Sequence, residues 1–420
     1  MNKLYAMRIS EIWNYVEKQD LLFWLINLYL FFEYVRPQTL YRALDILPYA
    51  QIIILLTLAL ATIRGTLGKV SNPLNKLIVL YFLVILASSV QALSPETSYS
   101  KLSEFISWMI IYFLIVNIIN TESRFLIFIL AFMIYSFKMS QFSFRNWIAS
   151  GFGFVGIGTG GGPGWFHNSG EFGIQMVIFF SFGACFFWAL KKHWPRWKQA
   201  VFFLFPLTAL TGTVSSSSRG AVLGVAGVIA FWMLKSRYKI RGILLAGVLA
   251  IIVFAIIPPE QKARFEAMGN DDTSTSRIEY WKRGLELIER YPVLGVGHEN
   301  WLVAQEKVFG IENSEISHNI FIQCAADLGY TGFSVLLLLI FFTFRNNYNV
   351  RRIIRDSRRD NDFLFFMSHA LDGALVGYMV SGFFVTVLYY PYFWINLAMT
   401  ASLREATRVW ASSNSTIQAS

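Results

Sequence analysis

The chain has 420 residues, of which 55% are hydrophobic, 17% are aromatic and only 15% are charged, with a formal net charge of +10. Soluble globular chains carry roughly 25% charged residues, so this composition excludes a soluble domain, and also a disordered, fibrous or disulfide-stapled chain. A membrane helix needs about 20 apolar residues, and the hydrophobic content is sufficient for about a dozen. The composition therefore predicts an all-α, polytopic membrane protein.

Apolar runs predict about twelve membrane-spanning helices along the chain. An amphipathic segment at 1–20 comes first, and no small-residue cleavage site follows the first apolar run, so we expect no cleavable signal peptide. Only a short turn before Pro391 separates the last two runs. The predicted spans are 21–36, 47–63, 77–93, 103–119, 125–140, 172–190, 199–213, 220–234, 242–258, 319–344, 366–388 and 391–403.

The distribution of basic residues predicts the orientation of these spans. If the N-terminus lies inside, the short segments on that side hold most of the Lys and Arg residues, including six arginines from Arg345 to Arg359. By the positive-inside rule both termini are therefore cytoplasmic, and 259–318 lies outside. This bias accounts for most of the net charge. No motif for binding RNA or DNA accompanies it, so nucleic acid is not an expected partner.

The predicted topology divides the chain into three parts. Residues 1–258 form an N-terminal bundle of about nine helices, 259–318 form a long extracytoplasmic loop between the ninth and tenth helices, and 319–420 hold the last helices and a cytoplasmic tail. Loops of this length are usually functional or disordered, so 259–318 is the expected catalytic loop. Cys185 and Cys324 both fall in apolar stretches and are interpreted as packing residues.

One amphipathic helix is predicted inside the long loop. Ser276 and Glu279 form a capping box, which predicts a helix that begins there, with Arg277 at its first position. An apolar stripe follows at Ile278, Trp281, Leu285 and Ile288, and Tyr291-Pro292 ends the helix. A helix N-terminus favours an anion, and an arginine adds a planar fork that suits phosphate. The alternative is a solvated arginine on a surface helix.

Two further residues are predicted at helix starts on the same outer face. Arg219 follows four serines at 215–218 and either holds a phosphate or extends to the lipid head groups. His318 opens the span 319–344, where the helix terminus disfavours the cationic ring and leaves a neutral base near pH 7. The alternative for His318 is a structural role. Because Arg219, Arg277 and His318 share one face, we expect them to share a cavity.

Two other patterns do not predict a cofactor or a metal site. Gly151–Gly156 matches the G-x-G-x-x-G pattern, but no strand precedes it and no βαβ unit surrounds it. Asp271-Asp272 lacks an organised third ligand and is interpreted as a turn. The sequence therefore predicts neither a bound cofactor nor a metal ion.

Four segments together resemble the core of the bacterial O-antigen ligase/O-antigen polymerase superfamily: Thr275–Trp281, Tyr291–Gly297, Ser317–Phe321 and Asp327–Gly332. Ser218–Ala221 fits an upstream motif of that superfamily. Arg36–Gln38 and Leu47–Gln51 more loosely resemble its exosortase-associated O-glycosylation ligase branch. The core resemblance covers roughly 210–335. Two departures leave the acceptor open: Ile322 stands where the superfamily usually has leucine, and His298-Glu299 stand where smaller residues are common.

The resemblance implies a C-type, metal-independent, inverting glycosyltransferase in the bacterial plasma membrane, with its active site facing the periplasm. Members transfer a glycan from an undecaprenyl-pyrophosphate carrier to an acceptor such as lipid A core, a protein or another glycan. The resemblance implies that His318 is the base and that Arg219 and Arg277 hold the pyrophosphate. Asn319, Tyr280, Trp281 and His298 are candidate accessory residues, and membrane lipids surround the chain.

Two other functions remain open at this point. The first is an O-antigen or exopolysaccharide polymerase, which the same motifs fit. The second is a transporter or lipid-linked sugar flippase, which typically has inverted repeats, broken helices and charges near the midplane. The predicted spans are nearly free of charge, and the polar residues gather in the outer loop instead. This distribution favours a transferase.

Overall fold

The computed structural model describes residues 3–153, 158, 166, 168–236, 247, 272–312 and 314–413. Within these ranges the secondary structure is helical throughout, as the composition predicts. Six helical segments are long and apolar enough to cross a membrane, which supports a multi-pass membrane protein. They are α5 (Pro73–Val90), α6 (Pro95–Ile118), α7 (Glu122–Ala149), α8 (Ser169–Leu190) with the turn η3 (Lys191–His193), α15 (Ile320–Asp356) and α16 (Asp362–Gly382).

Five other predicted spans are also helices, but they are shorter or more polar than these six. They are α2 (Leu21–Tyr34), α4 (Tyr49–Ile63), α9 (Arg196–Ser215), α10 (Arg219–Lys235) and α17 (Pro391–Ser412). Apart from Gly247, the predicted span 242–258 lies outside the described residues, so the total of twelve stays a prediction. The predicted end of the span 366–388 is wrong, because α16 already ends at Gly382. Residues 383–390 instead form a loop that contributes to the site described below.

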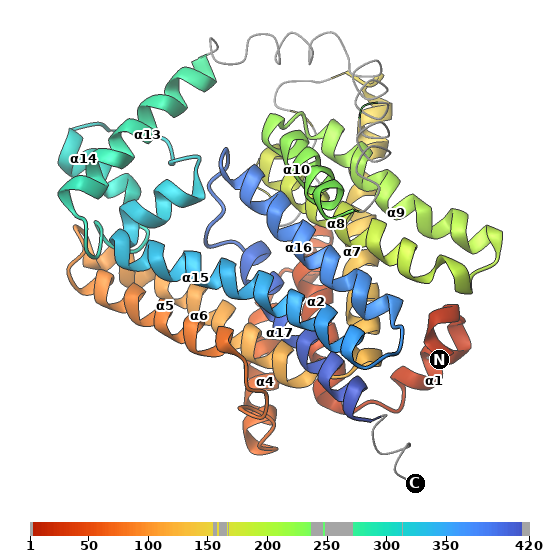
Figure 1. Ribbon diagram of the computed structural model, residues 1–420. Helices are drawn as coiled ribbons and strands as arrows, with labels where there is room; N and C mark the ends of the chain where they lie inside the picture. The colour runs from red at the N-terminus through yellow and green to blue at the C-terminus, as the bar shows by residue number, and fades with distance from the viewer. Residues whose placement is uncertain are drawn as a thin grey trace.

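The helices pack into one bundle in which α16 lies against α8 and α10, α17 against α6, and α15 against α5 (Figure 1). Large aromatic side chains fill the contact between α5, α6 and α17. Trp394 meets Phe105 edge to face, with ring centroids 4.8 Å apart, and Tyr81 with centroids 5.3 Å apart. All three side chains are fully buried, so this contact excludes solvent from the middle of the bundle.

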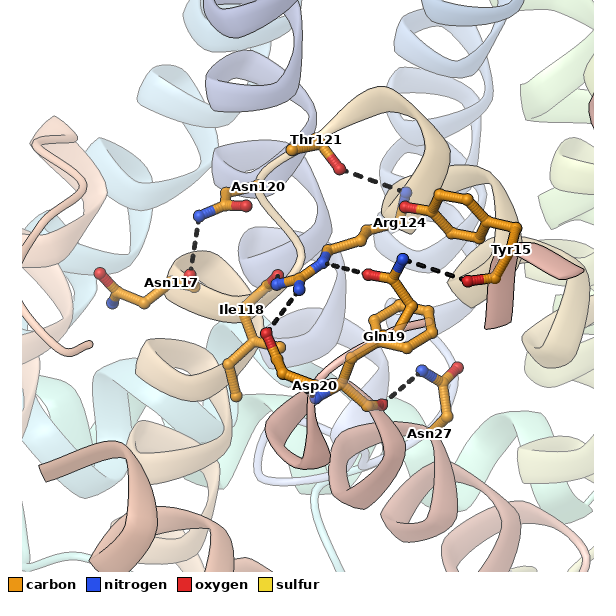
Figure 2. Close-up of polar contacts among 10 residues, drawn as sticks. Tyr15, Gln19, Asp20, Asn27, Asn117, Ile118, Asn120, Thr121 and Arg124 are labelled. Carbon is orange, nitrogen blue, oxygen red and sulfur yellow. Dashed lines mark hydrogen bonds and ion pairs between the residues drawn. The ribbon is translucent and has the colours of Figure 1, made fainter. Parts of the chain in front are cut away.

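Arg124 joins several chain segments at one end of the bundle (Figure 2). Its guanidinium donates to the Asp20 carboxylate at 2.6 Å, to the Gln19 side chain at 2.9 Å and to the Ile118 carbonyl at 3.0 Å. Asp20 also caps α2, because it accepts from the Phe23 amide at 2.9 Å. The arginine therefore ties the turn between α1 (Ile9–Val16) and α2 to the turn between α6 and α7.

Other segments predicted on the cytoplasmic side meet at this same end. The Tyr5 hydroxyl, in η1 (Lys3–Ala6), donates to Glu122 at the start of α7, and Lys192 pairs with Asp362 at the start of α16. In Figure 1 the N-terminus and α1 lie at the right, whereas α13 (Asp272–Arg290) and α14 (Trp301–Phe309) lie at the left. The segments predicted to be cytoplasmic and the helices of the predicted outer loop thus lie at opposite ends of the bundle.

The predicted start of the helix in the long loop is wrong. α13 begins at Asp272, so Ser276 lies inside it, and Glu279 pairs with Arg283 at 3.4 Å instead of capping the helix. No glycine or proline separates Asp272 from Ser276, so nothing in the sequence stops the helix from extending in that direction. Arg277 therefore lies beyond the first turn. Asp272, expected in a turn, is the first helical residue, and Asp271 lies outside the described residues.

The end of α13 at Arg290 agrees with the prediction from Tyr291-Pro292, and a second loop helix, α14, was not expected.

Short elements complete the described secondary structure near the N-terminus. They are α3 (Pro37–Leu40) and η2 (Arg42–Leu44), which lie between α2 and α4.

α15 is broken at Gly329, and the loop that follows α13 pairs with the break. Gly329 has φ +64° and ψ −171°, which interrupts the helical backbone. The carbonyls of Ala326 and Asp327 accept from the amides of Val296 and Gly297 at 2.9 and 3.0 Å. Beyond the break, the amide of Tyr330 donates to the carbonyl of Pro292 at 2.7 Å. These bonds satisfy backbone groups that the interrupted helix leaves unpaired.

The same loop is held on its other side by the corner between α5 and α6. The carbonyl of Val296 accepts from the Leu93 amide at 2.9 Å. The buried Asn300 side chain accepts from the Ser94 amide at 2.7 Å and donates to the Ser98 hydroxyl at 2.8 Å. Residues 292–300, which we call the docking loop, are therefore fixed between α15 and the α5–α6 corner.

We predict that Gly329→Ala destabilises the folded protein strongly. An added Cβ would lie 2.4 Å from the backbone of Val293, and φ +64° is unfavourable for alanine by about 1–2 kcal/mol. Gly310→Ala is the matched control, because Gly310 has φ +68° but open space around its Cα. Thermal unfolding of the purified variants in detergent should show a clearly larger loss for Gly329→Ala. Equal losses would contradict the docking role of the break.

Candidate active site

Three hydrogen bonds fix the backbone of the segment that carries His318. The indole of Trp301 donates to the carbonyl of Glu315 at 3.0 Å, and the indole of Trp281 donates to the carbonyl of Ser317 at 3.2 Å. The amide of His318 donates to the hydroxyl of Thr386 at 2.7 Å. One of these bonds comes from each of α14, α13 and the loop 383–390. The arrangement of these three segments therefore determines where His318 lies.

His318 lies immediately before Asn319, the N-cap of α15, and so near the predicted helix start, and it adopts a left-handed backbone conformation. Its φ is +50°, which is unfavourable for a residue with a Cβ and persists only where surrounding contacts enforce it. Asn319 is the N-cap of α15 and accepts from the amides of Phe321 and Ile322 at 2.9 and 3.1 Å. The half-buried imidazole lies near the ring of Tyr280 on α13, with ring centroids 6.3 Å apart.

Burial and the positive charge of Arg277 lower the pKa of His318 to about 4. The lowered pKa was predicted from the sequence, but the predicted cause was the helix terminus. The structure instead gives desolvation of the ring as the larger cause and the nearby guanidinium as the second. At pH 7 the imidazole is therefore neutral and able to accept a proton. The interaction also places Arg277 close to His318, although Arg277 is not at a helix start.

Arg219 lies at a helix start, as predicted. It is the first residue of α10, and the Ser218 hydroxyl caps the helix by accepting from the Ala221 amide at 3.3 Å. Gly220 packs against Phe384, and Trp281 packs against the neighbouring Phe383 with ring centroids 5.2 Å apart. The loop 383–390 is thus the common neighbour of the start of α10, of α13 and of the His318 segment.

The sequence analysis missed the residues that hold this loop. Thr386 was placed inside a predicted apolar span, where a hydroxyl between two valines was the available signal. Glu171, buried near the start of α8, accepts from the Tyr390 hydroxyl at 3.1 Å and from the Asn168 side chain at 2.9 Å. The hydroxyl of Tyr392 donates to the Glu171 carbonyl at 3.1 Å. Glu171 therefore anchors the far end of the loop to α8.

The four candidate accessory residues fall into two groups. In the first group, Asn319 caps α15, Tyr280 lies near the imidazole of His318, and Trp281 holds the Ser317 carbonyl. His298 belongs to the docking loop, is only 1% exposed and meets Tyr389 edge to face with centroids 4.6 Å apart. Burial lowers its pKa to about 4. His298 therefore has a packing role in this structure, and replacing it would leave a cavity in the loop.

A cavity of about 730 Å³ borders the His318 segment, and Ser317 and Thr386 form part of its wall. Arg219, Arg277 and His318 are not among the residues that line it, so a cavity shared by these three stays a prediction. No group of three or more His, Cys, Asp or Glu side chains is arranged to hold a metal ion within the residues that the structure describes.

Comparison with known proteins agrees with the motifs. Residues 202–337 match the model of the O-antigen ligase family. The matched segment contains Arg219, Arg277 and His318 together with the docking loop and the break in α15. The resemblance to the O-antigen ligase/polymerase superfamily is therefore confirmed.

A relative with a printed function is the exopolysaccharide production protein ExoQ of Rhizobium meliloti (strain 1021). It is 24% identical over 220 residues, which make up 49% of this chain and 50% of that protein. The chain thus matches about half the length of this relative.

We predict that Thr386→Val impairs the site, whereas Thr386→Ser largely preserves it. Valine has nearly the same shape as threonine but leaves the buried amide of His318 without an acceptor, which costs about 1–3 kcal/mol. Serine keeps the hydroxyl. Thermal unfolding and hydrogen exchange at the His318 amide should both separate the two variants. The hydrogen bond would have no structural role if the two variants behaved alike.

Proposed function

We propose that the chain is a membrane glycosyltransferase of polysaccharide biosynthesis. It transfers a glycan from an undecaprenyl-pyrophosphate carrier to an acceptor hydroxyl on the outer face of the bacterial plasma membrane. The match to the O-antigen ligase family and the similarity to an exopolysaccharide production protein support a ligase- or polymerase-type role. The observation that carries the proposal is the neutral imidazole of His318 beside the cationic Arg277, on a segment whose backbone is fixed by three hydrogen bonds.

The proposed reaction is a direct displacement at the anomeric carbon of the donor. His318 accepts the proton of the acceptor hydroxyl as the hydroxyl oxygen forms the new glycosidic bond. The bond between the anomeric carbon and the phosphate oxygen breaks, and undecaprenyl pyrophosphate leaves with the electron pair. Arg277 and Arg219 stabilise the charge on this leaving group. Attack from the side opposite the phosphate inverts the anomeric configuration.

The nearness of Arg277 to His318 links donor binding to the strength of the base. With a pKa of about 4, the imidazole of His318 is a weak base, whereas a general base works best with a pKa near the operating pH. A bound pyrophosphate would offset the charge of Arg277 and add negative charge of its own. Both changes favour the imidazolium and raise the pKa of His318. The base therefore becomes stronger when the donor is in place.

A polymerase is the second candidate, and a specific observation favours it. The relative ExoQ is an exopolysaccharide production protein, and a polysaccharide chain grows when one glycan is joined to another. A ligase and a polymerase would share the donor, the base and the leaving-group site. They would differ in the acceptor, which is lipid A core or a protein for a ligase and another glycan for a polymerase.

We predict that His318→Ala abolishes glycan transfer but leaves donor binding intact. Loss of a general base costs about 10²–10⁴-fold in rate, whereas the arginines that would hold the pyrophosphate are unchanged. His193→Ala, at the opposite end of the bundle, is a better control than a change at the buried His298. Purified variants assayed with carrier-linked glycan provide the measurement. Full transfer by His318→Ala would remove this residue from the catalytic role.

We predict that Arg219→Lys and Arg277→Lys fail nearly as badly as the corresponding alanine variants. Lysine keeps the charge but lacks the planar fork that binds two phosphate oxygens at once. Arg290→Lys is the control, because Arg290 lies exposed at the end of α13 and pairs with Glu286. Donor binding and transfer should be measured together on each variant. Near-normal transfer by both lysine variants would show that a positive charge alone is sufficient.

A further inference from the structure

α1 is an amphipathic helix that packs only part of its apolar face on the bundle. Ile12, Tyr15 and Val16 pack against the bundle and are half-buried. Ile9 and Trp13 lie one turn apart on the adjoining edge of that face, and they are 86% and 60% exposed. A short helix with one apolar and one polar face is typical of a segment that lies in the surface of a membrane.

Three hydrogen bonds attach the residues before α1 to the turn between α8 and α9 (Figure 1). The indole of Trp194 donates to the carbonyl of Tyr5 at 2.8 Å. The ammonium group of Lys198 donates to the carbonyls of Ala6 and Met7 at 2.8 and 2.9 Å. α1 begins shortly after these residues, so α1 and the α8–α9 turn form one continuous surface.

Basic residues outnumber acidic ones on this surface. Residues 8–16 and 188–198, which we call the basic surface, contain five Lys and Arg residues, and Glu11 is their one acidic residue. Lys192 pairs with Asp362, so it does not add to the excess of positive charge. The other basic residues are Arg8, Lys191, Arg196 and Lys198. The basic surface therefore stays positive after its ion pair is counted.

Two exposed tryptophans on the basic surface each have a lysine over the ring. The ammonium nitrogen of Lys191 lies 3.5 Å from the ring centroid of Trp188, and that of Lys198 lies 5.4 Å from the centroid of Trp197. Both rings are exposed, so they do not fill the interior of the bundle. Exposed tryptophans with adjacent lysines are typical of the boundary between the apolar layer and the headgroups of a bilayer.

Exposed apolar side chains continue from the basic surface along two of the predicted spans. Their spacing of three or four residues places each set on one side of its helix. An apolar stripe of this kind faces lipid in a multi-pass membrane protein, which favours a membrane over a soluble protein as the partner of the basic surface. The exposed residues are Val201, Leu204 and Leu207 on α9, and Leu21, Trp24 and Leu28 on α2.

We propose that the basic surface binds anionic phospholipids in the leaflet at this end of the bundle, which is the predicted cytoplasmic end. Ile9 and Trp13 insert beneath the headgroups, and Arg8 and Arg196 contact the lipid phosphates. The guanidinium fork can bind two phosphate oxygens at once, and a positive surface attracts an anionic leaflet. The inference does not depend on the proposed transfer reaction, because α1 and the helices next to His318 lie at opposite ends of the bundle.

The first test measures lipid binding at the basic surface itself. A fluorophore is attached to Asn14→Cys, an exposed position on α1, because both native cysteines, Cys185 and Cys324, are buried. The full-length protein in neutral detergent is titrated with phosphatidylglycerol that carries a quencher, and separately with phosphatidylcholine that carries the same quencher. We expect phosphatidylglycerol to quench the fluorophore at a concentration at least about tenfold lower.

Charge variants show whether the named arginines cause this preference. Arg8→Gln/Arg196→Gln should lose most of it, because the two guanidinium groups are removed. Lys282→Gln/Arg290→Gln is the matched control, since it removes the same charge from α13 at the opposite end and should retain the preference. Equal quenching by the two lipids, or an unchanged preference in Arg8→Gln/Arg196→Gln, would overturn the lipid assignment.

The second test needs no loss of charge, so it remains decisive if the arginine variants fail to fold. A nitroxide is attached to Trp13→Cys in nanodiscs that contain both phospholipids. Oxygen, which concentrates in lipid, should relax this label more strongly than a water-soluble nickel chelate does. Asn14→Cys, on the polar face of α1, should show the reverse. Equal access of the nickel chelate to both positions would show that α1 does not insert.

Discussion

The pairing between the docking loop and the broken α15 is the constraint on which the candidate site depends. An interrupted helix in an apolar bundle exposes backbone groups that must be paired with protein, because lipid offers no partner. Here the amides of Val296 and Gly297 and the carbonyl of Pro292 provide that pairing. α14 begins immediately after the docking loop, so Trp301 is placed to hold Glu315. The position of the His318 segment thus follows from a backbone contact rather than from the site residues themselves.

This arrangement explains why residues without any chemical role accompany the site residues in the recognised motifs. Tyr291–Gly297 and Asp327–Gly332 are the two partners of one backbone contact. A Cβ on Gly297, with φ +114°, would lie 2.2 Å from Ala92 at the α5–α6 corner. The motif glycines therefore allow the chain segments to approach, whereas in the proposed reaction Arg219, Arg277 and His318 provide the charge and the base. Stability and chemistry are divided between different residues of the same motifs.

Local signals predicted the parts of the structure that local contacts determine. Ser218 and Asn319 mark true helix starts, so the positions of Arg219 and His318 were predicted correctly. The capping box at Ser276 was misleading, because the upstream residues also support a helix and α13 extends to Asp272. The break at Gly329 and the role of Thr386 depend on partners distant in sequence. The periodicity of a single apolar run carries no information about such partners.

The ionisation constant of His318, with and without donor, tests the account most directly. Full-length protein labelled with ¹⁵N-histidine would be titrated by NMR, with the signal assigned by comparison with His318→Gln. We expect a pKa near 4 in the empty site, and an increase of at least about one unit when a non-transferable lipid pyrophosphate binds beside Arg277. A pKa near the unperturbed value of about 6.5 that does not change on binding would contradict the proposed coupling between Arg277, the donor and the base.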